Sequence, residues 1–125
     1  MNLASSPECF YCVCEEESVE HIFWECEVVH PFLQEVFDWL IKQGLIEIIP
    51  DQKSFILGNL QLREIENMVF IVVKYFIYKS RLKTEWLNMK LFILFLKSFY
   101  TIEHKIAMQN NMVEAYKRRW RNVLL

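Results

Sequence analysis

The sequence predicts a mainly α-helical protein, with a small cysteine-containing unit docked on a bundle of about five helices. Only two glycines and three prolines occur in 125 residues, which leaves few turns between elements. Hydrophobic residues make up 54% of the chain and aromatic residues 15%, a composition that supplies a buried core and excludes disorder. Apolar residues also recur at helical spacing over long stretches of the chain.

The length fits a single domain over residues 1–125, with the small unit at 9–28 and the helical bundle at 29–125. The longest apolar runs, at 68–73 and 91–96, are six residues each. A bilayer span needs roughly 20, so we expect no membrane association. Nothing near the N-terminus resembles a signal peptide, so we expect an intracellular protein, nuclear or cytoplasmic, without disulfides.

The small unit contains three cysteines and one histidine within 18 residues: Cys9, Cys12, His21 and Cys26. These are the ligands of a closed structural zinc site, and a Cys-x2-Cys turn can direct both sulfurs at one ion. The sequence therefore predicts a Zn²⁺ cofactor, held in a zinc knuckle that docks on the helical bundle. The alternative is that these are ordinary buried cysteines. Cys14 competes with Cys12 as the second thiolate ligand, and the sequence leaves that choice open.

A short helix should follow the Cys-x2-Cys turn and supply His21 and Cys26, with Ser18 as its N-cap and His21 at the N3 position. Residues five apart do not stack on one face of a regular helix, so we expect this helix to loosen or end near Cys26. The next helix should contain Pro31 in its first turn and end at Gly44.

Residues 45–60 are expected to form a loop with one helical turn, and the alternative for 45–49 is a short strand. Residues 61–83 should form a long helix that is apolar nearly all round in its middle. Such a helix belongs at the centre of a bundle, so we expect it to be the least exposed helix.

Residues 88–109 should form another long helix, capped by Asn88, and residues 111–122 a last one. Side chains from five expected helices are assigned to the core. They are Trp24 and Trp39; Leu62, Ile65, Met68, Val69, Ile71, Val72, Tyr75, Phe76 and Leu82; Leu91, Phe92, Phe95, Phe99, Ile102 and Ile106; and Met112, Ala115, Tyr116 and Trp120.

The net charge of −2 conceals a split along the chain. Residues 1–40 contain nine acidic residues and no Lys or Arg, whereas residues 41–125 contain 14 basic and seven acidic residues. This asymmetry indicates a basic face for a polyanion, or two halves that attract each other. Lys90 and Lys97 are two helical turns apart, and Tyr75, Tyr78 and Tyr100 could stack on unpaired bases. The candidates for phosphate contact are Lys79, Arg81, Lys83, Lys117, Arg118, Arg119 and Arg121.

Signatures of catalysis are absent from the sequence. There is no Gly-rich phosphate loop, no nucleophile elbow and no paired aspartate motif for two-metal chemistry. His30 and His104 stand alone, the first beside a helix start and the second on a helix surface shared with Lys105. We therefore do not expect an enzyme.

The pattern Cys9-x2-Cys12-x8-His21-x4-Cys26 resembles the zinc-binding segment near the C-terminus of reverse transcriptases from non-LTR (LINE-type) retrotransposons. The chain that follows also resembles that family: residues 67–70 and 74–81 resemble its long helix, and Trp120 matches near the end. The last two ligands lie in the segment Glu20-His21-Ile22-Phe23-Trp24-Glu25-Cys26, which is part of the resemblance. The chain departs from the family at Val13-Cys14, because the family often has glycine after the second cysteine.

The resemblance implies an accessory module that binds nucleic acid, either template RNA or target DNA. The polymerase core is not in this sequence, so the module should not synthesise DNA and should act beside the rest of a reverse transcriptase. The alternative is a helical protein-interaction domain in which zinc only holds the fold.

Overall fold

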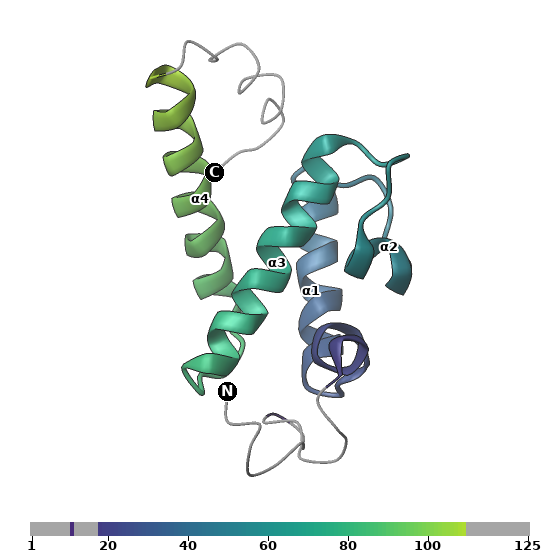
Figure 1. Ribbon diagram of the computed structural model, residues 1–125. Helices are drawn as coiled ribbons and strands as arrows, with labels where there is room; N and C mark the ends of the chain where they lie inside the picture. The colour runs from purple at the N-terminus through teal and green to yellow at the C-terminus, as the bar shows by residue number, and fades with distance from the viewer. Residues whose placement is uncertain (1–10, 12–17, 110–125) are drawn as a thin grey trace.

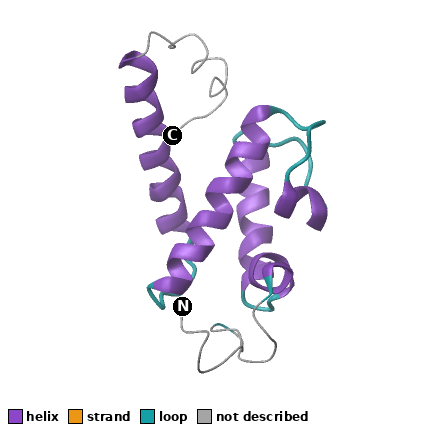
Figure 2. Ribbon diagram, viewed as in Figure 1, coloured by secondary structure: helices purple, strands orange, loops and turns teal. Residues whose placement is uncertain are grey.

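The computed structural model describes Tyr11 and residues 18–109; predictions for residues 1–10, 12–17 and 110–125 lie outside the described residues. Within that part the mainly α-helical class is confirmed, and no strand forms there, at 45–49 or elsewhere (Figure 2). The elements in chain order are η1 (His21–Glu25), α1 (Val29–Lys42), α2 (Gln52–Leu57), α3 (Glu64–Leu82) and α4 (Met89–Gln109).

Helices α1 and α3 lie together at the centre, with α2 on one side and α4 on the other (Figure 1). The N-terminal half of α4 meets the C-terminal half of α3, and the two helices diverge beyond that point. None of the helices in the described ranges is both long and apolar enough to cross a bilayer.

Three phenylalanines join α1, α3 and α4 at one point. Phe32 and Phe76 stack with ring centroids 5.9 Å apart, and Phe92 meets them edge-on at 6.3 and 5.5 Å. All three side chains are buried. Because edge-to-face and offset aromatic pairs add to the gain from burial, this cluster fixes where α4 crosses the bundle.

A second aromatic cluster joins α1, α2 and α3. Phe37, Phe55 and Phe70 lie with ring centroids 5.4 to 6.2 Å apart, and each is 2% exposed or less. Trp24 extends the cluster by contacting Phe37 and Phe55 at 6.2 and 5.7 Å. Burying a phenylalanine is worth about 1.5–3 kcal/mol relative to exposing it, so the short helix α2 is held chiefly by Phe55.

Local capping signals place several helix ends. Gly44, with φ of 75°, follows α1 in the left-handed conformation that favours glycine. The Asp51 carboxylate accepts a hydrogen bond from the Ser54 N–H at 3.1 Å and begins α2. The Asn88 side chain accepts one from the Leu91 N–H at 3.2 Å, which confirms its predicted role at the start of α4.

Helix α3 begins at Glu64 because of a buried acid that periodicity did not reveal. Glu66 is 5% exposed, and its carboxylate accepts hydrogen bonds from the Arg63 N–H at 3.1 Å and from the Glu47 N–H at 3.2 Å. The Arg63 side chain also donates to it at 3.2 Å. Glu66 thus caps α3 and ties the loop before α2 to its first turn.

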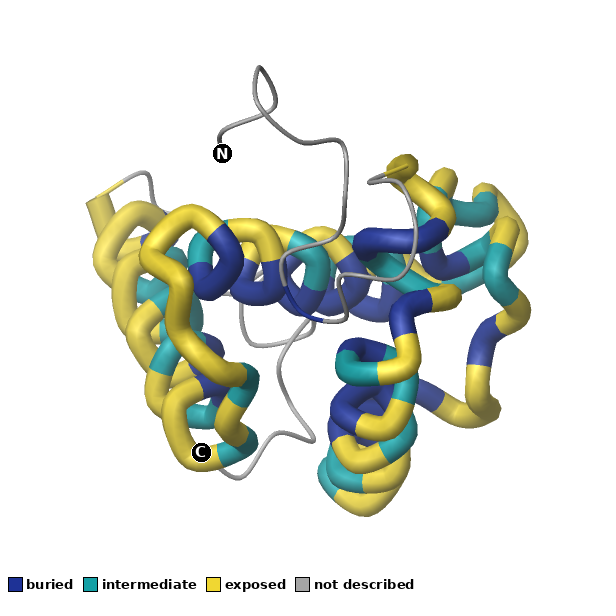
Figure 3. Tube along the Cα trace, turned by 90° about the horizontal axis from the view of Figure 1, so that it is seen from below, coloured by how far each residue is buried: buried dark blue, intermediate teal, exposed yellow. Residues whose placement is uncertain are grey.

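Among the described helices, the long helix is the least exposed, as predicted. Ten of the 19 residues of α3 are buried, against six of 14 in α1 and three of 21 in α4. Figure 3 shows the dark blue segments where the central helices face each other, and much more yellow along α4.

Several side chains assigned to the core are nevertheless exposed. Leu91, Ile102 and Ile106 on α4 are 48, 58 and 52% exposed, because only one edge of α4 packs on the bundle. Ile71, Tyr75 and Leu82 on α3 are 62, 52 and 45% exposed, although the Tyr75 ring contacts Phe95 of α4. Trp24 and Trp39 are half-buried and pack against the core.

Candidate metal centre and nucleic-acid interface

His21 and Cys26, the two predicted zinc ligands within the described residues, lie at the two ends of a π-helical turn. The Ser18 hydroxyl oxygen accepts a hydrogen bond from the His21 N–H at 3.1 Å, as expected of an N-cap. The Cys26 N–H then donates to the His21 carbonyl at 2.9 Å, and the helix ends there with Cys26 at φ −60° and ψ 129°. The expected loosening is therefore present, as an i→i+5 turn of a kind often found at functional sites.

Both side chains are shielded from water. His21 is 2% exposed and Cys26 is fully buried. The turn between them packs on α1, and Trp24 within it anchors the turn to the second aromatic cluster. His30 secures the same turn, because its Nδ1–H donates to the Trp24 carbonyl at 3.0 Å while Gln34 donates to its Nε2 at 3.2 Å. His30 therefore has a structural role at the start of α1.

Tyr11, which lies between Cys9 and Cys12 in the sequence, is in contact with the bundle. Its hydroxyl donates to the Glu85 carbonyl at 2.9 Å, across 74 positions of sequence. Its ring lies 5.8 Å from the Trp86 ring, and the Arg81 guanidinium lies 5.3 Å from its centroid. These three partners belong to the end of α3 and the loop after it, so Tyr11 is anchored there.

The described half of the predicted donor set suits zinc. An imidazole nitrogen and a thiolate sulfur are ligands that Zn²⁺ takes, and a structural site is closed to water. His21 and Cys26 supply one of each from a turn whose ends are fixed by backbone hydrogen bonds. Cys9, Cys12 and Cys14 lie outside the described residues, and no group of three or more candidate ligands occurs within residues 18–109 and Tyr11.

Arg81, predicted to contact phosphate, is instead buried. It is 4% exposed and lies beneath the ring of Tyr11. The physical reason is its register on α3: it follows buried Ile77 by one turn and shares that inward face. We therefore remove Arg81 from the phosphate-binding set and assign it to the contact between Tyr11 and α3.

The other predicted basic residues divide into three groups. Lys83 is exposed at the end of α3. Lys79 is half-buried, with its Nζ 5.5 Å from the Tyr75 ring and 5.9 Å from the Phe95 ring. Lys117, Arg118, Arg119 and Arg121 lie outside the described residues.

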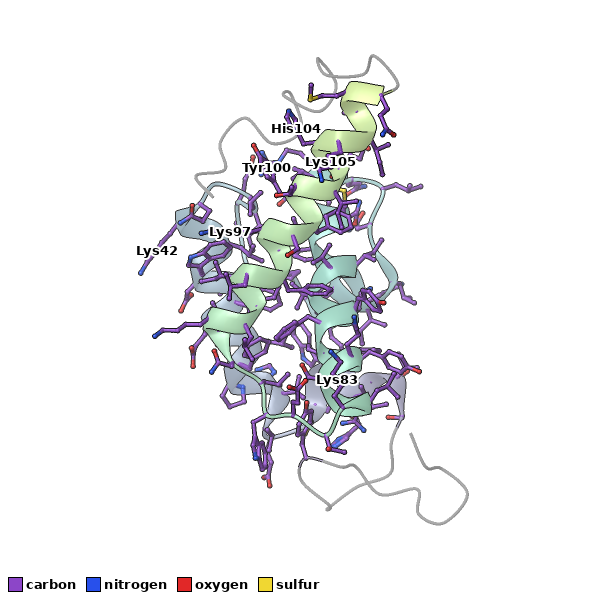
Figure 4. All side chains as sticks on the ribbon, turned by 90° about the vertical axis from the view of Figure 1, so that its left-hand side faces the viewer. Lys42, Lys83, Lys97, Tyr100, His104 and Lys105 are labelled. Atoms are coloured by element: carbon purple, nitrogen blue, oxygen red, sulfur yellow. The ribbon has the colours of Figure 1, made fainter. Side chains whose placement is uncertain are left out.

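Four exposed lysines outside the predicted set extend the basic surface. Lys90, Lys97 and Lys105 are exposed along α4, and Lys42 is exposed at the end of α1. Figure 4 shows Lys42, Lys83, Lys97 and Lys105 on one view of the molecule, with Tyr100 and His104 on α4 among them. The seven-residue interval between Lys90 and Lys97 was visible in the sequence, but the position of Lys42 depends on how α1 and α4 pack.

Acidic and basic residues are unevenly distributed along the described part of the chain. Residues 18–40 contain five acidic residues, all exposed, and no Lys or Arg. Residues 67–109 contain seven basic residues and only two acidic ones, Glu85 and Glu103. The charge split of the sequence is therefore retained within the described residues, and the exposed Lys42 at the end of α1 lies beyond the acidic stretch.

Lys74 belongs to the packing of α2 rather than to the open basic surface. Its Nζ donates to the Ile56 carbonyl at 2.6 Å and lies 5.6 Å from the Phe55 ring. Burial lowers the pKa of this amine. It borders an apolar pocket of about 300 Å³ between α2 and α3, which Asn67 closes on one side by bonding the Asn59 backbone through both amide atoms.

Comparison with known proteins supplies no family: no family model, curated protein or solved structure matches this chain. The case for function therefore rests on the residues and contacts described above.

Proposed function

We propose that this chain is an accessory nucleic-acid-binding module, related to the C-terminal region of non-LTR retrotransposon reverse transcriptases and without catalytic activity of its own. The observation that supports this best is the excess of basic residues over the α3–α4 region. Template RNA or target DNA is the proposed partner, beside the rest of a reverse transcriptase.

The exposed lysines suit a phosphate backbone because they are spread over a long surface rather than paired with acids. Lys90, Lys97 and Lys105 follow α4, and Lys83 extends the surface to the end of α3. The salt bridges found among the described residues involve Arg63 with Glu47 and Glu66, far from these lysines in sequence. Neutralising several phosphates releases counterions, which provides affinity without sequence preference.

The proposed zinc site has a structural task in this module. Cys9, Cys12, His21 and Cys26 would hold the ion, with Cys14 as the alternative to Cys12. Closing that site would tie the Cys-x2-Cys segment to η1, and Tyr11 itself contacts the end of α3 and the loop after it. Zinc would thereby join the acidic N-terminal region to the helix that begins the basic surface.

A second candidate function is a helical protein-interaction domain. Its support is an exposed apolar stripe on α3, formed by Ile71, Tyr75, Tyr78 and Leu82 at intervals of four, three and four residues. A partner helix could pack on residues spaced in this way.

Salt dependence separates the two functions. For binding of the full chain to a labelled single-stranded RNA, the logarithm of the association constant should fall linearly with the logarithm of the salt concentration. The slope should be about −0.7 for each phosphate contacted. Apolar docking to a protein would not show this dependence. If the chain binds neither RNA nor DNA at low salt, the interaction domain becomes the better interpretation.

Elemental analysis tests the metal separately. The reduced protein should contain one zinc per chain, or take up one when zinc is added after metal removal. A stoichiometry near zero that added zinc does not restore would exclude the site without excluding nucleic-acid binding.

A further inference from the structure

The exposed aromatic side chains of the described residues are gathered in one short stretch. Tyr75, Tyr78 and Trp86 are 52, 40 and 68% exposed, and every other aromatic side chain within the described ranges is buried or half-buried. We propose that these three rings form a stacking platform, and that it makes the module select unpaired over base-paired nucleic acid. This inference rests on the proposed function and names its ligand class.

Two of the rings lie on α3. Tyr75 and Tyr78 are one turn apart, and both side chains are exposed. The Tyr75 ring packs edge-on against Phe95 of α4 at 5.8 Å, with an interplanar angle of 64°. It is therefore held in place while half of its surface stays open, so stacking a base on it costs little side-chain entropy.

The third ring is held by Tyr11. The Trp86 ring lies 5.8 Å from the Tyr11 ring at an interplanar angle of 30°, and the Tyr11 hydroxyl is bonded to the adjacent Glu85 carbonyl. Trp86 nevertheless remains 68% exposed. Tyr11 therefore supports Trp86 from one side and leaves the indole accessible from the other.

Cations lie between the rings in sequence. Lys79 and Lys83 fall between Tyr78 and Trp86, and Lys79 also approaches the Tyr75 ring at 5.5 Å. Glu85 is the single acidic residue in the described stretch 67–102. Aromatic rings interleaved with lysines are the arrangement by which proteins bind single strands, with bases on the rings and phosphates on the cations.

This arrangement predicts discrimination between strands and duplexes. Bases in a duplex are stacked on each other, so their faces cannot reach a protein ring, whereas an unpaired strand exposes them. The lysines contact phosphate in either case. The rings should therefore add affinity for single strands alone, and the lysines should supply the part common to both ligands.

Fluorescence anisotropy tests the proposal by comparing how the full chain binds a labelled RNA as a single strand and as a duplex. The RNA has about 12 nucleotides, within the range of known single-strand site sizes. The test variant replaces Tyr75, Tyr78 and Trp86 with leucine, which keeps apolar side chains and removes the rings. The matched control replaces all three with phenylalanine, which keeps the rings. Neither variant changes a charge, so the salt dependence of duplex binding should stay as in the wild type.

We expect the wild type and the phenylalanine control to prefer the single strand by about tenfold or more, the scale of one stacked base. The leucine variant should lose that preference and bind the duplex as before. Equal wild-type affinity for strand and duplex, or a leucine variant that keeps the preference, would overturn the platform while leaving the proposed function standing. Failure of the wild type to bind either ligand would overturn both and leave this face to a protein partner.

Discussion

Helices α3 and α4 are alike in length and rich in apolar residues, yet they are buried to very different extents. Ten of 19 residues are buried in α3, but only Phe92, Leu96 and Ala107 are buried among the 21 of α4. Helix α3 contacts neighbours on several sides, whereas α4 meets the bundle along one edge and then diverges (Figure 1). Apolar content alone therefore does not determine burial; how much of a helix its neighbours cover also matters.

The charged residues of the two helices follow the same division. On α3, Glu66 and Arg81 are buried, and both contact segments distant in sequence. On α4, Lys90, Lys97 and Lys105 are exposed. Substitutions inside α3 should therefore change stability, and substitutions of the α4 lysines should change binding.

A carboxylate placed on each helix should have very different effects on stability. Val72 on α3 is 2% exposed, so Val72→Asp should lower the free energy of unfolding by about 4 kcal/mol, because it buries a carboxylate with no compensating charge. Ile102→Asp on α4, at a site 58% exposed, should change it by about 0.5 kcal/mol or less. Denaturant unfolding followed by circular dichroism measures both, and equal destabilisation would remove the distinction between the helices.

Metal removal should have the second-largest effect on the stability of the protein. Free zinc at about 100 times its dissociation constant should add about 2.7 kcal/mol to the stability of the zinc-free protein. His21→Ala and Cys26→Ser should abolish this zinc-dependent gain, since each removes a proposed ligand. Thermal melts with and without zinc provide the measurement, and a variant that kept the full gain would show that its residue is not a ligand.

Glu66 tests the capping of α3 in a milder way. Glu66→Ala leaves the N–H groups of Arg63 and Glu47 without their carboxylate partner, which should cost about 1–3 kcal/mol. Glu64→Ala removes an exposed acid from the same helical turn and serves as the control, with a destabilisation of roughly a few tenths of a kcal/mol. Similar values for the two variants would contradict the assigned role of Glu66.

The smallest expected effect concerns the pH dependence of the α2 cap. Hydrogen bonds from Ser54 hold the pKa of Asp51 below its ordinary value of 3.8. Because the folded pKa is depressed, this stabilisation is complete above pH 3.8 and disappears as pH falls through the folded pKa. The difference in melting temperature between wild type and Asp51→Asn should therefore narrow at low pH, and a difference independent of pH would contradict the ionised cap.

Local chemistry explains which parts of the fold could be predicted from sequence. Ser18, Gly44 and Asn88 mark helix ends because a cap depends on residues only a few positions away. The five-residue interval from His21 to Cys26 likewise indicated a change from regular helix, and a π-helical turn is present.

The remaining features depend on contacts between distant segments. Arg81 shares the inward face of α3, but its contact with Tyr11 joins segments that are distant in sequence, and the exposure of Ile102 reflects the divergence of α4 from α3. Glu66 gave the sequence signal of an ordinary surface acid, although it follows Arg63 at the spacing of a capping residue. The complete zinc site and the basic residues after α4 stay predictions, since Cys9, Cys12 and 117–121 lie outside the described residues.

If the exposed lysines of α4 and Lys83 at the end of α3 bind phosphate, removing them should change the slope of log affinity against log salt. The variant carries Lys83→Gln, Lys90→Gln, Lys97→Gln and Lys105→Gln, and Lys53→Gln on α2 is the control for an exposed lysine outside the surface. With single-stranded RNA, the slope should flatten by about 0.7 for each phosphate that is no longer neutralised, or about 2.8 for all four substitutions. The control slope and all melting temperatures should match the wild type. An unchanged slope in the fourfold variant would contradict phosphate binding by these lysines.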